Sequence, residues 1–191
     1  MTTTTSPLLD DDVLPMVELL ALCLDGQVYR VGDAFASADT PDGPELRAHA
    51  FARTAPAWAV ADRGTAAWIH GARSSPPPVP QVCVPPSHRG GGMLARLDAA
   101  YRPLPGDDTL TFAGMRVTTP LRTAHDLLCT PGRFTDADAL EIRHLLVLAE
   151  VTPARLDERL RAARRRGRDL ARARLPQVAR ALLVGAPPEA A

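Results

Sequence analysis

Three predicted helix starts, close together, constrain the fold of this chain more than any other feature of its sequence. Thr119-Pro120 and Thr152-Pro153 each place a good N-cap residue before a proline, which suits the first turn of a helix. Between them, Thr135 and Asp138 have the spacing of a capping box, ahead of an apolar run at residues 139–149. We therefore predict that the last third of the chain is helical.

The first two thirds of the chain combine shorter helix and strand signals. Residues 13–24 are predicted to form a helix, and QVYRVGDAF carries strand signals with a bend at Gly32-Asp33. The next elements are predicted in this order: helices at 44–58 and 64–71, a stiff connector at 74–80, a strand in QVCVP, a loop in SHRGGG and two or three strands within 96–118. The expected fold class is α+β, with a small mixed β-sheet in the first two thirds and a helical C-terminal third.

Charge is distributed unevenly, although 22 basic residues balance 22 acidic ones. Residues 1–62 hold ten acids against three arginines, whereas residues 153–180 hold ten arginines against three acids. A chain of this kind could recruit a polyanion at its basic end. Lysine is absent, which is typical of the codon usage of a GC-rich genome, so arginine content alone does not indicate guanidinium chemistry.

The basic segment has helical spacing. Its apolar face is predicted to contain Leu156, Leu160, Ala163, Gly167 and Leu170, with a possible break at Gly167 and an expected end at Pro176. The candidate phosphate-binding residues, most of them on the opposite face, are Arg161, Arg164, Arg165, Arg168 and Arg172. Such a row could give salt-dependent binding to DNA. The alternatives are a solvated helix face and contact with an acidic partner or with the acidic N-terminal region of this chain.

The remaining polar residues do not form a recognisable catalytic or metal-binding motif. The five histidines include neither HExxH nor an HxH pair, and the neighbours Ser87-His88 and His125-Asp126 do not make a triad by adjacency. Arg122 and Asp126 have the spacing of a local ion pair on a helix surface, and Gly90-Gly91-Gly92 is interpreted as a flexible loop. We therefore predict no catalytic residue, no metal, no cofactor and no small-molecule substrate.

The cysteines and the N-terminal sequence indicate a reducing compartment. Cys23, Cys83 and Cys129 are unclustered and odd in number, which favours reduced, buried thiols. The segment MTTTTSPLLDDD does not have the basic and apolar regions of a secretory signal, and no stretch approaches the roughly 20 apolar residues of a membrane span. We expect no membrane partner and a cytoplasmic location.

Three segments resemble the AbiEi-like family of bacterial antitoxins and transcriptional regulators. GTAAWIHGARSSPPPVPQVCVPPSHR resembles the core segment of that family. MRVTTPLRTAHDLL is similar to its signature V-T-[ST]-P-x-R-T-x-x-D-L, and EVTPARLDERLRAARRRGRDLARARL is similar to its terminal helices. The three matches follow the family's order and cover about residues 58–182.

The resemblance implies a division of the chain into four parts. Members commonly carry an N-terminal winged helix-turn-helix; here QVYRVGDAFA looks like the wing, but a single plausible helix precedes it. The expected parts are a disordered acidic tail at 1–12, a truncated winged-helix-like remnant at 13–40, an AbiEi-like α+β domain with basic C-terminal helices at 41–183 and a disordered tail at 184–191. A nuclease-like domain, which some members carry, has no room before Ala191.

The resemblance also implies a function in a toxin–antitoxin locus. We expect a non-catalytic, antitoxin-like transcriptional regulator that contacts DNA through its C-terminal arginine-rich helix. The family is thought to oppose a nucleotidyltransferase-like toxin without forming a tight complex with it, so a cognate toxin locus is the expected partner. The alternatives are a protein-interaction module that has lost DNA binding and a remnant of a nuclease-associated system.

Overall fold

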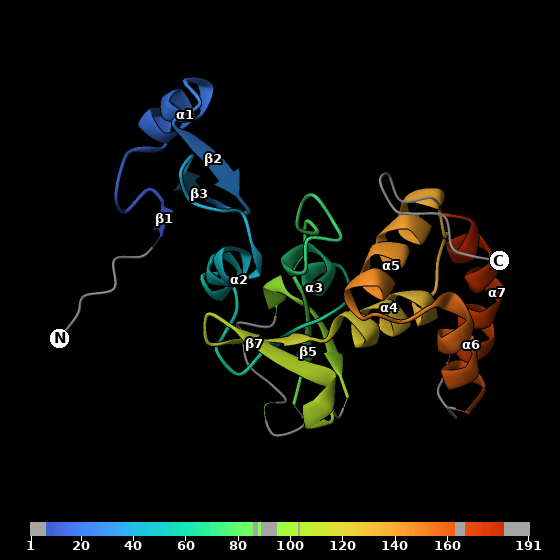
Figure 1. The fold of residues 1–191 in the computed structure, drawn as a ribbon. Coiled ribbons are helices and arrows are strands. Elements are labelled where there is room, and N and C mark those ends of the chain that lie inside the picture. The colour runs from blue at the N-terminus through green and yellow to red at the C-terminus, as the bar shows by residue number, and fades with distance from the viewer. Residues whose placement is uncertain (1–6, 86–87, 89–94, 103, 163–166, 182–191) are drawn as a thin grey trace.

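The computed structural model describes residues 7–85, 88, 95–102, 104–162 and 167–181 (Figure 1). The first part of the chain is a small unit of one helix on a three-stranded antiparallel sheet with strand order β1-β3-β2. Its elements are β1 (Leu8–Leu9), α1 (Met16–Leu24), β2 (Val28–Val31) and β3 (Ala34–Ser37). The predicted helix and the hairpin bent at Gly32-Asp33 are confirmed.

The expected disordered tail is wrong over residues 7–12, while residues 1–6 lie outside the described part of the chain. Leu8 and Leu9 pair with β3, and the Leu8 side chain is buried in the main core. The carboxylate of Asp10 is also buried, and it forms an ion pair with Arg53. The sequence suggested a tail because these partners lie far along the chain.

A five-stranded mixed sheet forms the centre of the fold, with strand order β6-β5-β4-β8-β7. Its strands are β4 (Val60–Ala61), β5 (Gln81–Val84), β6 (Asp98–Tyr101), β7 (Thr109–Phe112) and β8 (Met115–Thr118). β4 is parallel to β8 and β5 is parallel to β6, whereas the other two pairs are antiparallel. Helices α2 (Pro44–Ala52) and α3 (Arg63–Ile69) pack against this sheet. A 3-10 turn, η3 (Gly106–Asp108), precedes β7.

The last third is helical, as predicted. It contains α4 (Pro120–Cys129), α5 (Asp136–Leu148), α6 (Pro153–Ala162) and α7 (Arg168–Arg180). All three predicted helix starts are confirmed. The hydroxyl of Thr119 accepts from the Arg122 amide, and that of Thr152 accepts from the Arg155 amide. Thr135 and Asp138 form the reciprocal capping box.

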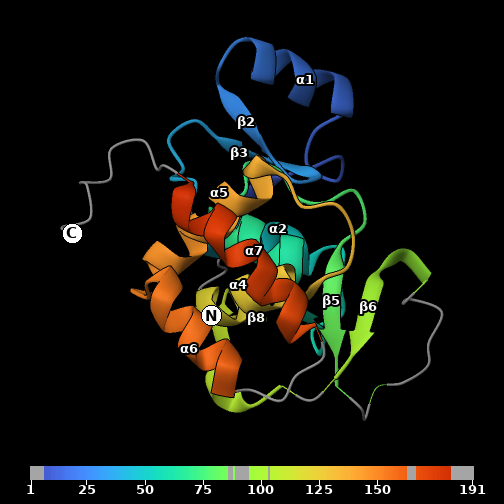
Figure 2. The same ribbon diagram turned by 90° about the vertical axis from the view of Figure 1, so that its right-hand side faces the viewer.

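Two apolar cores meet at α3. The sheet core takes Ala66, Trp68 and Ile69 from this helix, and the helical core takes Ala67 from its other side. Because neighbouring residues of α3 point into different cores, one short helix joins the sheet to α4–α7. Figure 2 shows α6 and α7 side by side on the face of the molecule that they form. The N-terminal unit lies at one end of the molecule and α6 and α7 lie at the other (Figure 1).

Some sequence-based expectations differ from the structure in detail. The helix expected at 44–58 ends at Ala52, and β4 was not expected. Three strands occur within 96–118, and the strand in QVCVP is confirmed as β5. The SHRGGG segment lies outside the described residues except for His88, which stacks on the Trp58 ring at a centroid distance of 4.8 Å. None of the described helices has the length and apolar character needed to cross a membrane.

Candidate functional site

The predicted arginine row is divided between two helices. Arg161 is near the end of α6, and Arg168 and Arg172 belong to α7. Gly167 precedes α7 with a left-handed backbone, φ +83°, so a single straight helix does not run through this segment. Arg164 and Arg165 lie outside the described residues.

The predicted apolar face is confirmed in α6 and wrong in α7. Leu156 and Leu160 are fully buried in the helical core. Leu170 is 36% exposed, because the break at Gly167 changes the angular position of every residue that follows it. The expected end at Pro176 is also wrong, since α7 continues to Arg180 with this proline inside it.

One carboxylate joins the two basic helices. Asp157 of α6 accepts a hydrogen bond from Arg161 Nη2 at 2.5 Å, within the same helix, and from Arg172 Nε at 2.9 Å, across to α7. The side chains of Arg161 and Arg172 are 63% and 41% exposed. The Arg172 and Arg161 hydrogen bonds keep the pKa of Asp157 below its usual value. Two guanidinium groups, distant in sequence, therefore lie together at the surface.

Arg174 has a different position from its neighbours in α7. Its guanidinium group is buried and donates to the carbonyl oxygens of Leu128, Thr130 and Gly132, at 2.7 to 2.8 Å. The group also lies over the Phe134 ring, 4.8 Å from the centroid. It satisfies carbonyl groups at and just beyond the C-terminal end of α4. Arg174 therefore stabilises the helical core and is not available to a ligand.

The Arg122–Asp126 pair is present, but the expectation of a surface pair is wrong. Both residues are 6% exposed, and Arg122 Nε donates to Asp126 Oδ2 at 2.8 Å. Arg122 also pairs with Asp108 of η3. The start of α4 lies against η3, since the Thr119 amide donates to the Asp108 carbonyl oxygen, and Arg102 covers Asp126.

Arg102 extends this pair into a larger charge network. Its Nη2 atom donates to Asp62 Oδ2 at 2.6 Å and to Asp126 Oδ2 at 2.8 Å. Arg63 donates to Asp62 at 3.1 Å and to Asp98 at 2.8 Å. Nothing local in the sequence indicates these contacts, because Arg102 lies 40 residues from Asp62 and 24 from Asp126.

Ionisation within the network follows from burial and from the neighbouring charges. Burial raises the pKa of Asp62 to about 6, although Arg63 and Arg102 oppose the shift. Asp126 and then Cys129 raise the pKa of His125 to about 9, so its imidazole is protonated at neutral pH. Charges of both signs are thus paired across α3, β6, η3 and α4. Each described carboxylate in the network is bound by guanidinium or imidazolium groups.

The cysteines and the possible metal ligands can be described separately from the charge network. The three cysteines are free; Cys83 is buried as expected, whereas Cys23 and Cys129 are partly exposed. Among the residues that the structure describes, His, Cys, Asp and Glu side chains do not gather in threes in a way that could hold a metal ion.

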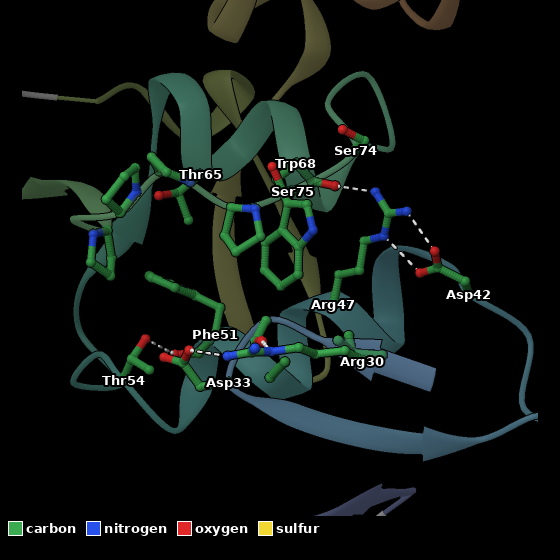
Figure 3. A pocket seen from close by; sticks show the side chains of 17 residues that line it. Arg30, Asp33, Asp42, Arg47, Phe51, Thr54, Thr65, Trp68, Ser74 and Ser75 are labelled. Carbon is green, nitrogen blue, oxygen red and sulfur yellow. Dashed lines mark hydrogen bonds and ion pairs between the residues drawn. The ribbon is translucent and has the colours of Figure 1, made fainter. Parts of the chain in front are cut away.

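A cavity of about 520 Å³ lies where the β2–β3 hairpin meets α2, α3 and the proline-rich connector (Figure 3). The rings of Phe51 and Trp68 line it. Arg47 donates to the Trp68 carbonyl oxygen at 2.6 Å and pairs with Asp42, whose pKa its hydrogen bond lowers. The described lining includes two carboxylates, Asp33 and Asp42, and neither histidine nor cysteine. Sequence reasoning did not predict this cavity, which long-range packing forms.

Comparison with known proteins places most of the chain in one family. No curated protein matches the chain. The family model of the AbiEi antitoxin C-terminal domain matches residues 59–177. This match spans the five-stranded sheet, the charge network and nearly all of the helical third, and it includes both Arg122 and Asp126. The chain belongs to the AbiEi antitoxin family.

Proposed function

We propose that this protein is a non-catalytic, antitoxin-type regulator that binds the DNA backbone through α6 and α7. The contacts are made by Arg161, Arg168 and Arg172, together with Arg164 and Arg165 of the intervening segment. The antitoxin role is supported by the family match. The DNA contact rests on one observation: Asp157 holds Arg161 and Arg172 side by side at the surface.

The charge balance of this surface favours a polyanion. Residues 153–162 and 167–180 hold seven arginines against three acids. Arg174 is buried, which leaves six arginines at least partly exposed. Exposed ion pairs such as Arg161–Asp157 contribute little to stability, so their guanidinium groups can exchange a carboxylate for a phosphate at small cost. Release of counterions from DNA then drives binding.

The N-terminal unit is a poor candidate for reading DNA. Among its described residues a single helix, α1, precedes the hairpin. Residues 7–27 contain five acids and no arginine. Because DNA binding depends on neutralising phosphates, such a segment repels a duplex. The interpretation of residues 13–40 as a truncated winged-helix remnant stays a prediction, as does a cytoplasmic location beside a cognate toxin locus.

The DNA contact can be tested by titrating a fluorescent duplex at several salt concentrations. The R161A/R172A variant should bind more weakly, and the slope of log K against log salt should fall by about 0.9 for each phosphate that is no longer neutralised. D157N should bind more tightly than the wild type, because it removes the negative charge that competes with phosphate for both guanidinium groups, while the amide oxygen can still accept from them. The control is R155A, which removes an exposed arginine from α6 outside the Asp157 cluster.

The outcomes separate the proposal from general attraction to a basic protein. If R155A weakens DNA binding as much as R161A or R172A does singly, the position of the arginine on the surface does not matter. A D157N variant that binds no more tightly would remove the reason for placing the contact at this cluster. If the protein does not bind the duplex at physiological salt, the alternative of a protein-interaction module is favoured. DNA cleavage abolished by a chelator would revive the nuclease-associated alternative.

A further inference from the structure

The outer side of α1 is an apolar stripe exposed to solvent. Val17 is 78% exposed and Leu24 is 91% exposed, and Leu20 between them is also exposed. Val13, just before the helix, continues the stripe, so that its members follow steps of four, three and four residues. This spacing places Val17, Leu20 and Leu24 on one side of α1; Val13 is exposed in the turn before the helix, and Met16 widens the stripe at its N-terminal end.

The opposite side of α1 already anchors the helix. Leu19 is fully buried with Val28 and Phe35 of the hairpin, and Leu22 and Cys23 pack against the same cluster. Figure 1 shows α1 at the extremity of the molecule, with its sheet on one side. The stripe is therefore not needed to hold α1 in place. Exposed apolar side chains gathered in this way mark interaction sites.

The charges around the stripe indicate what can cover it. Asp11 and Asp12 lie before its first residue, Glu18 lies in the first turn of α1, and Asp25 is its C-cap; all four are exposed. Residues 7–27 contain no arginine that could balance them. An occupant must therefore bring leucine-like side chains flanked by cations, because opposite charge at the rim selects partners and equal charge excludes them.

We propose that α1 docks a basic amphipathic helix of another protein. A second copy of α1 would place acids against acids. An anionic bilayer or a DNA duplex would be repelled in the same way. A helix with arginines or lysines beside its apolar face matches both the stripe and its rim, and it would bind as helices bind in apolar grooves and coiled coils. This inference is independent of the DNA contact at the other end of the molecule.

The experiment uses the full chain and a designed probe. A fluorescent Leu/Arg amphipathic peptide of about 20 residues, above the length at which an isolated helix is marginal, is titrated with the protein, and a Leu/Glu peptide of the same pattern is the comparison. The Leu/Arg peptide should bind and the Leu/Glu peptide should not. V17E/L24E should weaken binding at least about tenfold, whereas V147E, an equal change at an exposed valine of α5, should not.

Charge reversal gives a second, independent readout. E18R/D25R should weaken binding of the Leu/Arg peptide and should allow the Leu/Glu peptide to bind. Equal binding by V17E/L24E and the wild type would overturn the proposal. A wild-type dimer in sedimentation that V17E/L24E abolishes would also overturn it, because the occupant would then be a second copy. Binding to neutral vesicles that depends on α1 would overturn it too, because the occupant would then be a membrane. All variants change exposed residues, and V17E/L24E should leave the DNA titration unchanged.

Discussion

At the scale of single residues, Gly167 decides how the two basic helices are arranged. It is the N-cap of α7 with φ +83°, a conformation that glycine adopts without strain. A Cβ atom at this position would lie 2.9 Å from the carbonyl oxygen of Cys129 and 3.0 Å from its Cβ. The backbone of α7 therefore approaches the end of α4 more closely than any other residue would allow.

We expect Gly167→Ala to lower the free energy of unfolding by about 2–4 kcal/mol. The strain of a left-handed alanine accounts for roughly 1–2 kcal/mol, and displacement of backbone packed on the helical core adds the remainder. Gly26→Ala is the matched control, because Gly26 has φ +70° but no atom within 4 Å of its Cβ position. Urea denaturation measures both variants. Equal losses would show that the contact with Cys129 contributes nothing.

At the scale of elements, the sequence predicts best what is determined locally. The starts of α4, α5 and α6 could be predicted because each cap involves residues three positions apart. β1 and β4 have two residues each and exist through pairing with distant strands, so no local pattern indicates them.

The same limit applies to the candidate site. The face containing Leu156 and Leu160 follows from helical spacing, and its continuation to Leu170 fails where Gly167 interrupts it. The contact between Arg172 and Asp157 crosses from one helix to another, so it could not be predicted from spacing within a single helix.

Arg172 and Arg174 provide a test of what α7 contributes as an element. We expect Arg174→Ala to cost about 2–4 kcal/mol of stability, since it leaves three carbonyl groups at and beyond the end of α4 without a donor. Arg172→Ala, two residues away and exposed, should cost less than about 0.5 kcal/mol. Thermal and urea unfolding measure the difference. Similar losses in both variants would contradict the separation of a structural arginine from a surface one.

At the scale of the whole molecule, two surfaces of opposite character lie at opposite ends. The acidic, apolar side of α1 is at one end and the arginines of α6 and α7 are at the other (Figure 1). The shared core makes this separation rigid, because Leu8 and Val31 of the N-terminal unit are buried together with Leu46 and Phe51. The two ligands that we propose, a basic protein segment and DNA, would therefore not compete for the same surface.

The sheet core and the helical core should unfold together, because α3 contributes to both. Trp58 and Trp68 belong to the sheet core, so their fluorescence reports on that core, whereas far-UV circular dichroism is dominated by the helices. Leu145→Ala removes a fully buried side chain from the helical core alone and should cost about 2–5 kcal/mol. If the cores are coupled, it shifts the fluorescence and dichroism curves equally, as one cooperative transition requires.

The matched control for that variant is Val147→Ala, an exposed position on the same helix, which should shift neither curve. A Leu145→Ala protein whose dichroism midpoint falls while its tryptophan midpoint stays in place would show two independent units. In that case Ala67 on one side of α3 and Trp68 on the other would be in contact with separate cores without transmitting stability between them. The end with the basic helices α6 and α7 and the end with α1 would then be coupled by the chain alone.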